Sequence, residues 1–375
     1  MNRLTIFSFY NSKGYAANYV FYLLRELREV SDRIIVAVNG IIDEQSYMRM
    51  QEITGEIIIR ENKGFDAGAY KEVLFEYLKC DLSGYDELIL CNDTFWGFLR
   101  PFKGIIDTMA LRKCDLWGIC YVENEYANHI PSFFLAFRKS AIIKSFWDAF
   151  SEIDSSSTEI GVAYGAFECG IFNRLVEMEK MSYDYYAEID GFNFYSSAGK
   201  LISKYDFPLL KRRIVSNRWY NKSCLVKYIK YIKYNTSYDY RLILEDLHSN
   251  YDMLISEEKV ENAICDFTSE NNHVFHSHCS KVDILAYIEE KCPIYIYGAG
   301  AIAGRIYWLY LRENEYFKGF IVSDEIKLTS DKYLKQPVYH FSDLDLKDCK
   351  IIVAVDRQKY PDVLNRLGEY NILAI

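Results

Sequence analysis

Short apolar runs alternate with helical patterns along the first two hundred residues of the chain. Buried-strand patterns recur at residues 4–9, 34–38, 56–59, 88–91, 116–120 and 133–137. Between them, apolar residues at helical spacing predict helices near residues 20–30, 69–78 and 141–150. Strands that alternate with helices are typical of a mostly parallel sheet covered on both faces. The pattern therefore predicts an α/β fold, with a first domain over residues 1–215.

The pattern changes after Lys211, where Lys/Tyr-rich text gives way to polar helical text up to about residue 290. We interpret residues 216–290 as a helical connector, basic and aromatic at its start. A second α/β unit follows at residues 291–375, with strands predicted at 293–297, 320–322 and 351–355. The sequence thus predicts a small Rossmann-like domain at the C-terminal end.

A glycine-rich turn joins the first strand of that unit to its first helix. Gly298, Gly300 and Ala303 form the pattern GxGxxA directly after the strand, and Asp324 follows the next strand. In this setting, glycines let backbone N–H groups approach a phosphate, and a carboxylate some 20 residues on binds a ribose. We predict nucleotide binding by Gly298, Gly300 and Asp324. A purely structural tight turn is the alternative, because about 85 residues are few for a complete dinucleotide fold.

Length and composition limit the class of protein. With 375 residues, half of them hydrophobic, the chain is long enough for two cores. Its longest apolar runs fall far short of the roughly 20 residues that cross a bilayer, and its N-terminal segment lacks the h-region of a secretory signal. We expect a cytoplasmic protein, with its ten cysteines reduced and used for packing.

Charge is distributed unevenly. The formal net charge of −9 argues against nucleic acid as a partner, yet residues 211–237 carry eight basic side chains and no acidic one. Such a segment suits phosphates or an anionic membrane surface. Tyrosines interleave with the lysines of LVKYIKYIKYN, so a helix lying on the inner face of the plasma membrane is one interpretation. A solvated basic helix is the other.

A first polar cluster follows the apolar run EIIIR at residues 56–60. Its glycines, including Gly64, permit close backbone approach, while Asn62 and Asp66 can hydrogen-bond a base or a sugar hydroxyl. We predict that Asn62, Gly64 and Asp66 bind a nucleotide-sugar. A turn with Asp66 as the helix N-cap is the structural alternative.

Two further clusters stand where predicted strands end or begin. Asn92 and Asp93 follow the run LIL, where a carboxylate can hold Mg²⁺ or Mn²⁺ against a diphosphate. A single carboxylate makes a weaker metal site than an Asp-x-Asp pair, so Asp93 binding the sugar directly stays open. His129 and Ser132 precede the strand at 133–137, and Glu168 begins a helix from which it could deprotonate an acceptor hydroxyl.

Taken together, these residues resemble the rhamnan synthesis protein F family of polysaccharide glycosyltransferases over about residues 1–215. The family's Arg-x-Asn-x-Gly-Tyr-Asp-x-Gly motif is matched with Phe in place of Tyr, and its Asn-Asp-Ser segment with Thr in place of Ser. The matching positions are Arg60, Asn62, Gly64, Phe65, Asp66, Gly68, Asn92, Asp93, Thr94, Gly97, His129, Ser132, Phe133, Phe134, Phe146, Trp147, Glu168, Pro208, Lys211 and Arg212.

The resemblance implies a GT-A-like fold and transfer of a sugar, often rhamnose from dTDP-rhamnose, onto a lipid-linked glycan. In this interpretation Glu168 is the catalytic base, His129 positions acceptor or donor, and Asp93 lies near the diphosphate or metal. Asn92 and Ser132 join the nucleotide-sugar site.

Two other functions stay open at this stage. One is a non-catalytic assembly protein that binds nucleotide-sugars in the same pathway. The other is an NAD-dependent sugar oxidoreductase in the C-terminal unit, against which the absence of a Tyr-x-x-x-Lys pair in residues 293–375 counts.

Overall fold

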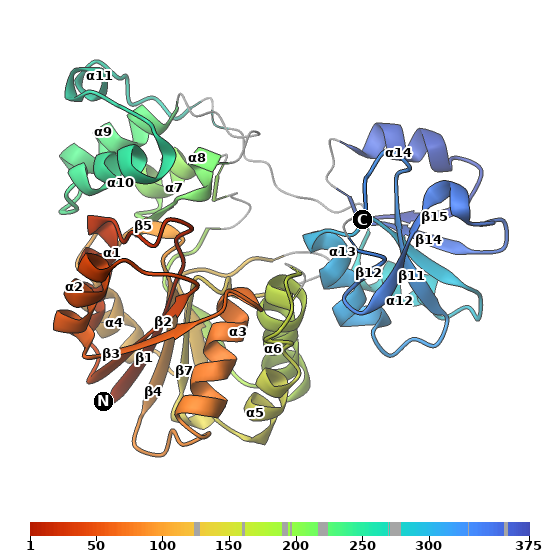
Figure 1. Ribbon diagram of the computed structural model, residues 1–375, viewed down its shortest axis with the longest axis horizontal. Helices are drawn as coiled ribbons and strands as arrows, with labels where there is room; N and C mark the ends of the chain where they lie inside the picture. The colour runs from red at the N-terminus through yellow and green to blue at the C-terminus, as the bar shows by residue number, and fades with distance from the viewer. Residues whose placement is uncertain are drawn as a thin grey trace.

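The computed structural model describes residues 1–123, 128–159, 162–189, 194–195, 197–216, 224–268, 270, 279–328, 330–355 and 359–375. In this part of the chain, a seven-stranded sheet has the order β3-β2-β1-β4-β7-β6-β8 (Figure 1). Its strands are β1 (Arg3–Phe9), β2 (Arg33–Asn39), β3 (Glu56–Arg60), β4 (Glu87–Asn92), β6 (Leu116–Gly118), β7 (Phe134–Arg138) and β8 (Tyr183–Tyr185). β1 to β4 are mutually parallel, and β7 runs antiparallel to both of its neighbours.

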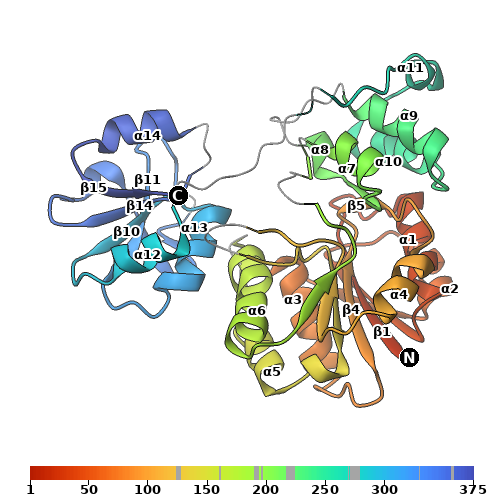
Figure 2. The same cartoon turned by 180° about the vertical axis from the view of Figure 1, so that it is seen from behind.

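Helices cover both faces of this sheet, as the unbroken apolar strands predict. In β1, Leu4 and Ile6 point into one core while Phe7 and Phe9 point into the other. Figures 1 and 2 show the two layers on opposite sides. One holds α1 (Asn18–Arg28), α2 (Glu44–Thr54) and α4 (Phe102–Ala110); the other holds α3 (Phe65–Glu72), α5 (Lys144–Ser151), η3 (Val162–Cys169) and α6 (Gly170–Phe172).

A group of helices stands over the carboxyl edge of the sheet, beside the two-stranded ribbon of β5 (Phe95–Gly97) and β9 (Leu209–Lys211). It comprises α7 (Ala198–Lys204), α8 (Arg213–Ser216), α9 (Leu225–Asn235), α10 (Arg241–Tyr251) and α11 (Glu257–Glu261). Ile229 of α9 and Leu247 of α10 are fully buried in the same core as α1. These helices therefore pack onto the first sheet, and the domain boundaries at 215 and 290 stay predictions.

The C-terminal unit contains a second sheet with the order β12-β13-β11-β10-β14-β15 within the described residues. Its elements are α12 (Lys281–Ile288), β10 (Ile294–Tyr297), α13 (Ala301–Ile306), η6 (Tyr307–Leu311), β11 (Phe317–Val322), β12 (Lys332–Tyr333), β13 (Gln336–His340), β14 (Lys350–Val353), α14 (Tyr360–Leu367) and β15 (Asn371–Ala374). Five of these strands are parallel, with two on each side of the central β10. The α/β class predicted from the sequence is confirmed.

The predicted membrane-surface helix corresponds to α9, whose apolar face is already used. Tyr228, Ile229 and Ile232 are buried in the core, and Lys233 forms an ion pair with Glu261. No helix in the described ranges is long and apolar enough to span a bilayer. Arg218 and Lys222 of the basic segment lie outside the described residues.

Candidate active site

Asp66 lies at the centre of a polar network at the carboxyl edge of the first sheet. Ser8, near the end of β1, donates its hydroxyl to Oδ1 of Asp66 at 2.7 Å, and Asn92, at the end of β4, donates Nδ2 to Oδ2 at 2.7 Å. Burial raises the pKa of Asp66, while these two hydrogen bonds lower it. The carboxylate is thereby held in one orientation.

The network continues across the neighbouring strand ends. Asn39, the last residue of β2, donates Nδ2 to Ser8 Oγ at 2.8 Å. Arg60, the last residue of β3, donates Nη1 to Asn39 Oδ1 at 2.5 Å and pairs with Glu72 at 2.8 Å. A continuous hydrogen-bonded belt therefore joins the ends of β3, β2, β1 and β4.

Two glycines, Gly64 just before α3 and Gly68 inside it, are required by the chain's own packing. Gly64 has a φ of +69°, and a Cβ placed there would stand 2.8 Å from Cα of Ser155. A Cβ at Gly68 would stand 2.6 Å from the carbonyl oxygen of Lys63. Gly64 is also the N-cap residue of α3, without a side-chain cap, so the alternative of Asp66 as N-cap is wrong. The half-buried Asn62 lies in this turn.

Asp93 is buried in a second cluster, which is built around the charges of Arg212 and Asp246. Tyr19 donates its hydroxyl to Oδ2 of Asp93 at 3.2 Å, and Nη1 of Arg212 stands 3.4 Å from the same oxygen. Arg212 also forms a two-pronged ion pair with Asp246, at 2.9 and 3.0 Å, and Trp96 donates its ring N–H to Asp246. Burial raises the pKa of Asp93 to about 7, although Arg212 acts to lower it.

The carboxylate oxygens at this edge do not fit the divalent cation predicted at Asp93. Oδ2 of Asp93 already faces the guanidinium of Arg212, and a positive group at that distance repels a metal ion. Both oxygens of Asp66 accept hydrogen bonds from neighbours. Within the described ranges, no three His, Cys, Asp or Glu side chains converge as a metal site.

Glu168 lies in η3 and faces the start of β7. Ser132 donates both its backbone N–H and its hydroxyl to Oε1 of Glu168, at 3.1 and 2.6 Å. The other oxygen, Oε2, is 3.9 Å from Nε2 of His129 and 3.3 Å from Nη2 of Arg305. The structure thus brings His129, Ser132 and Glu168 together, and it adds Arg305 from the C-terminal unit.

Lys211, at the end of β9, joins the Asp66 network through Thr94. Its Nζ donates to the hydroxyl of Thr94 at 2.6 Å, and Thr94 in turn donates to Asn92 Oδ1 at 2.6 Å. The ammonium also stands 4.4 Å from the centre of the Phe133 ring. Burial lowers the pKa of Lys211 to about 8, while the charges of Glu168 and Asp66 raise it.

The glycine turn of the C-terminal unit lies at the carboxyl end of its central strand. Gly298 has a φ of +123°, and a Cβ there would stand 2.5 Å from the carbonyl oxygen of Ala354, whereas a Cβ at Gly300 would meet nothing within 4 Å. Asp324 is exposed, and its Oδ1 accepts the backbone N–H of Ser342 at 2.9 Å. Gly298 is explained by packing, and nucleotide binding by this turn stays a prediction.

The C-terminal unit docks beside the Glu168 cluster through a polarised contact, with α13 toward the first sheet's helices in both views (Figures 1 and 2). A Cβ on Gly165 of η3 would stand 2.8 Å from the carbonyl oxygen of Gly304 in α13. Around this close approach, acidic groups of the first sheet's unit meet basic groups of the second. The pairs are Glu168–Arg305 at 3.3 Å, Glu152–Arg312 at 2.5 Å, Asp154–Lys335 at 2.8 Å and Glu177–Lys281 at 2.6 Å.

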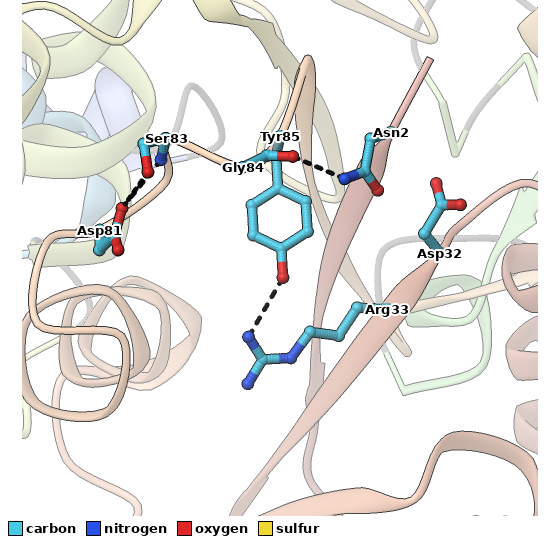
Figure 3. Close-up of a pocket in the computed structure, with 7 residues that line it drawn as sticks. All are labelled: Asn2, Asp32, Arg33, Asp81, Ser83, Gly84 and Tyr85. Atoms are coloured by element: carbon cyan, nitrogen blue, oxygen red, sulfur yellow. Dashed lines mark hydrogen bonds between the residues drawn. The ribbon is translucent and has the colours of Figure 1, made fainter.

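A pocket at the opposite edge of the first sheet is less suited to chemistry (Figure 3). It is lined by Asn2, Asp32, Arg33, Asp81, Ser83, Gly84 and Tyr85, at the amino ends of β1 and β2 and before β4. Its guanidinium, on Arg33, is held by Glu56 at 2.7 Å and by the Tyr85 hydroxyl at 3.1 Å. Open α/β sheets bind ligands at their carboxyl ends, so we place the site at the Asp66 edge.

Several site residues escaped the sequence interpretation. Ser8 and Asn39 are polar residues at the ends of buried strands, and the rule that selected Asn92 could have found them. Asp246 and Arg305 belong to helices far along the chain, and no local pattern marks them.

Comparison with known proteins places the chain by sequence. The sequence profile of the family described as "Rhamnan synthesis protein F" matches residues 34–294, well over half of the chain. A search of curated proteins found no match.

Solved structures give weaker likenesses. The glycosyltransferase GlyE of Streptococcus pneumoniae is 10% identical, with 100% of this chain and 91% of that chain covered and a TM-score of 0.31. A putative nucleotide-diphospho-sugar transferase from Desulfovibrio desulfuricans is 11% identical over 67% of this chain and 99% of that one, with a TM-score of 0.29. At such low TM-scores these likenesses carry no argument, and the relationship rests on the sequence match.

Proposed function

The chain belongs to the rhamnan synthesis protein F family, and on that premise we propose that it is a glycosyltransferase of cell-surface polysaccharide synthesis. It would move a sugar from a nucleotide-sugar to a glycan acceptor. The observation that best supports this is the presence of two groups at one edge of the sheet. They are the carboxylate of Glu168, which Ser132 orients, and the buried ammonium of Lys211. A base and a cation at one edge suit acceptor activation and diphosphate departure.

We assign the nucleotide end of the donor to the turn before α3 and the adjoining strand end. The Asp66 carboxylate is fixed by Ser8 and Asn92, and a preorganised carboxylate is a good acceptor for sugar or base hydroxyl and N–H groups. Asn62 and Gly64 lie in the same turn. Strand ends on both sides of α3 thus contribute to one binding edge.

Glu168 is the base in this proposal. The acceptor hydroxyl loses its proton to the carboxylate as its oxygen attacks the anomeric carbon of the donor. Ser132 holds Oε1, and Arg305 holds Oε2, so the carboxylate cannot rotate freely. His129, 3.9 Å from Oε2, positions the acceptor.

The finer assignments are part of the same proposal. We propose rhamnose from dTDP-rhamnose as the first donor to test and a lipid-linked glycan as the acceptor, which would bring the protein to the inner face of the membrane. For the C-terminal unit we propose a nucleotide ligand at Gly298, Gly300 and Asp324. The position of the turn supports this assignment. It lies at the carboxyl end of β10, whose two neighbours in the sheet are β11 on one side and β14 on the other, and open α/β sheets bind ligands at such a point.

A non-catalytic nucleotide-sugar-binding protein is the second candidate. It is favoured by the burial of Asp93, whose Oδ2 is tied to Arg212 and Tyr19. In that case the site would bind a donor without turning it over.

Donor turnover separates the two candidates. A panel of nucleotide-sugars that includes dTDP-rhamnose would be tested for binding and hydrolysis, with Mg²⁺, with Mn²⁺ and with chelator. Glu168→Gln is the test variant, and Glu76→Gln, at an exposed site, is its matched control. Turnover of one donor that is lost in Glu168→Gln and kept in Glu76→Gln supports the transferase. Donor binding without turnover supports the binding protein, and neither binding nor turnover contradicts both.

A further inference from the structure

Lys211 ends the β9 strand and Arg212 follows it, and the two basic side chains have different surroundings. Arg212 is fully engaged: it grips Asp246 with two N–H groups, stands 3.4 Å from Asp93 and stacks 4.6 Å from the Tyr19 ring centre. Its neighbour Lys211 is in none of the ion pairs formed by the described residues. Arg212 is therefore a structural cation, and Lys211 is not.

The ammonium of Lys211 is buried without an ion-pair partner among the described residues. The residue is 8% exposed, and the hydrogen-bond partner of its ammonium among the described residues is the Thr94 hydroxyl, with the Phe133 ring beside it. An ammonium has three donors, and a buried charge without an opposite charge in contact is costly. A bound anion would satisfy the remaining donors.

Position identifies the kind of anion. β9 pairs with β5, with Lys211 opposite Phe95, and this ribbon begins directly after the end of β4. The ammonium is therefore carried to the carboxyl edge of the first sheet. The charges of Glu168 and Asp66 act to raise its pKa, and this edge is where an open α/β sheet binds the phosphates of a nucleotide.

We propose that Lys211 is a catalytic residue that binds the diphosphate of the donor in place of a metal ion. The inference rests on the proposed function and deepens it. As the acceptor oxygen bonds to the anomeric carbon, the bond from that carbon to the phosphate oxygen breaks and its electron pair passes to the diphosphate. The acceptor's proton goes to Glu168, and the added negative charge on the leaving diphosphate is met by Lys211.

Equilibrium binding of UDP and dTDP tests the proposal without requiring turnover. The full-length protein would be titrated in EDTA and in Mg²⁺ as wild type, Lys211→Met and Lys211→Arg. Lys227→Met is the matched control from the same basic segment, because Lys227 donates to the backbone carbonyl of Asp266 and to none of the site residues. Thermal melting would show that each variant is folded.

We expect wild type to bind at least one nucleotide equally well in EDTA and in Mg²⁺. Lys211→Met should weaken that binding tenfold or more, Lys211→Arg should keep much of it, and Lys227→Met should leave it unchanged. In wild type, affinity should also fall as the pH rises beyond about 8, where the ammonium loses its proton. This measurement uses the wild-type protein alone and does not depend on whether a variant folds.

Three results would overturn the proposal: binding that requires Mg²⁺, binding that Lys211→Met leaves intact, or no binding of either nucleotide by wild type. Its failure is distinguishable from failure of the proposed function. Donor turnover that depends on a metal and ignores Lys211 keeps the transferase and removes this role. Lys211-dependent nucleotide binding without turnover of any donor keeps the diphosphate site and removes the transferase.

Discussion

Replacing Asp93 with asparagine should make the protein more stable at neutral and alkaline pH. In the folded protein, burial raises the pKa of this carboxyl from 3.8 to about 7, so folding favours its protonated form. Between these two values, the unfolded chain has released the proton and the folded chain has kept it. Stability contributed by this group is therefore present at acidic pH and lost as the pH rises toward 7.

The magnitude follows from the size of the shift. A difference of about three pKa units, in which the opposing effect of Arg212 is already included, corresponds to roughly 4 kcal/mol at 1.36 kcal/mol per unit. Asparagine carries no charge at any of these pH values and can still accept from Tyr19. Arg212 keeps its two-pronged pair with Asp246, so the substitution does not strand a guanidinium.

Urea unfolding of wild type and Asp93→Asn at pH 5, 6.5 and 8 measures the effect. The free energy of unfolding of the variant relative to wild type should rise by roughly 2–3 kcal/mol from pH 5 to pH 8, the remainder of the change lying below pH 5. Asp107→Asn is the control, because Asp107 forms an exposed pair with Lys103 on α4, and its difference from wild type should stay flat. A wild type that gains on Asp93→Asn as the pH rises would refute the reasoning, since it would mean that Arg212 outweighs burial.

Three further substitutions test the site and its second unit. Glu168→Gln should lower kcat by about 10²–10⁴ while nucleotide affinity stays unchanged, and a variant that keeps more than a tenth of the activity would exclude Glu168 as the base. Arg305→Ala should lower kcat about tenfold or more, the effect of losing one hydrogen bond to a charged group, and should change KM little. Arg305→Lys should keep much of the rate; equal losses in both variants would point to a merely structural role. Gly165→Ala should destabilise the fold by about 1–3 kcal/mol in urea unfolding, since its Cβ would stand 2.8 Å from the Gly304 carbonyl, whereas Gly104→Ala, with nothing within 4 Å, should not, and equal stabilities would contradict the close approach.

The pattern of the sequence identified the central strands because their burial on both faces leaves a strong signal. Residues 34–38 and 88–91 are unbroken apolar runs, and they became β2 and β4. The α2 helix was missed because its sequence EQSYMRMQEIT buries few side chains. β13 was missed because its sequence QPVYH is short, half-buried and interrupted by Pro337.

The candidate site was predicted in part for a similar reason. Asp66, Asn92 and Glu168 stand next to predicted strands or helices, so a rule about strand ends could select them. The partners that determine their state come from elsewhere: Lys211 arrives through the pairing of β9 with β5, and Arg305 arrives through docking of a second unit. Tertiary contacts of this kind leave no periodic signal in the chain.

The polarised contact between the two units makes the strength of their association depend on ionic strength. Its acidic side belongs to one unit and its basic side to the other, and attraction between such faces extends about 10 Å in 0.1 M salt but about 3 Å in 1 M salt. The backbones meet at Gly165 and Gly304, and Trp308 and Leu334 of the second unit pack against the core of the first beside them, an apolar contribution that salt does not screen. Added salt should therefore weaken the charged part of the contact, including the ion pair that places Arg305 beside Glu168, and leave its apolar part in place.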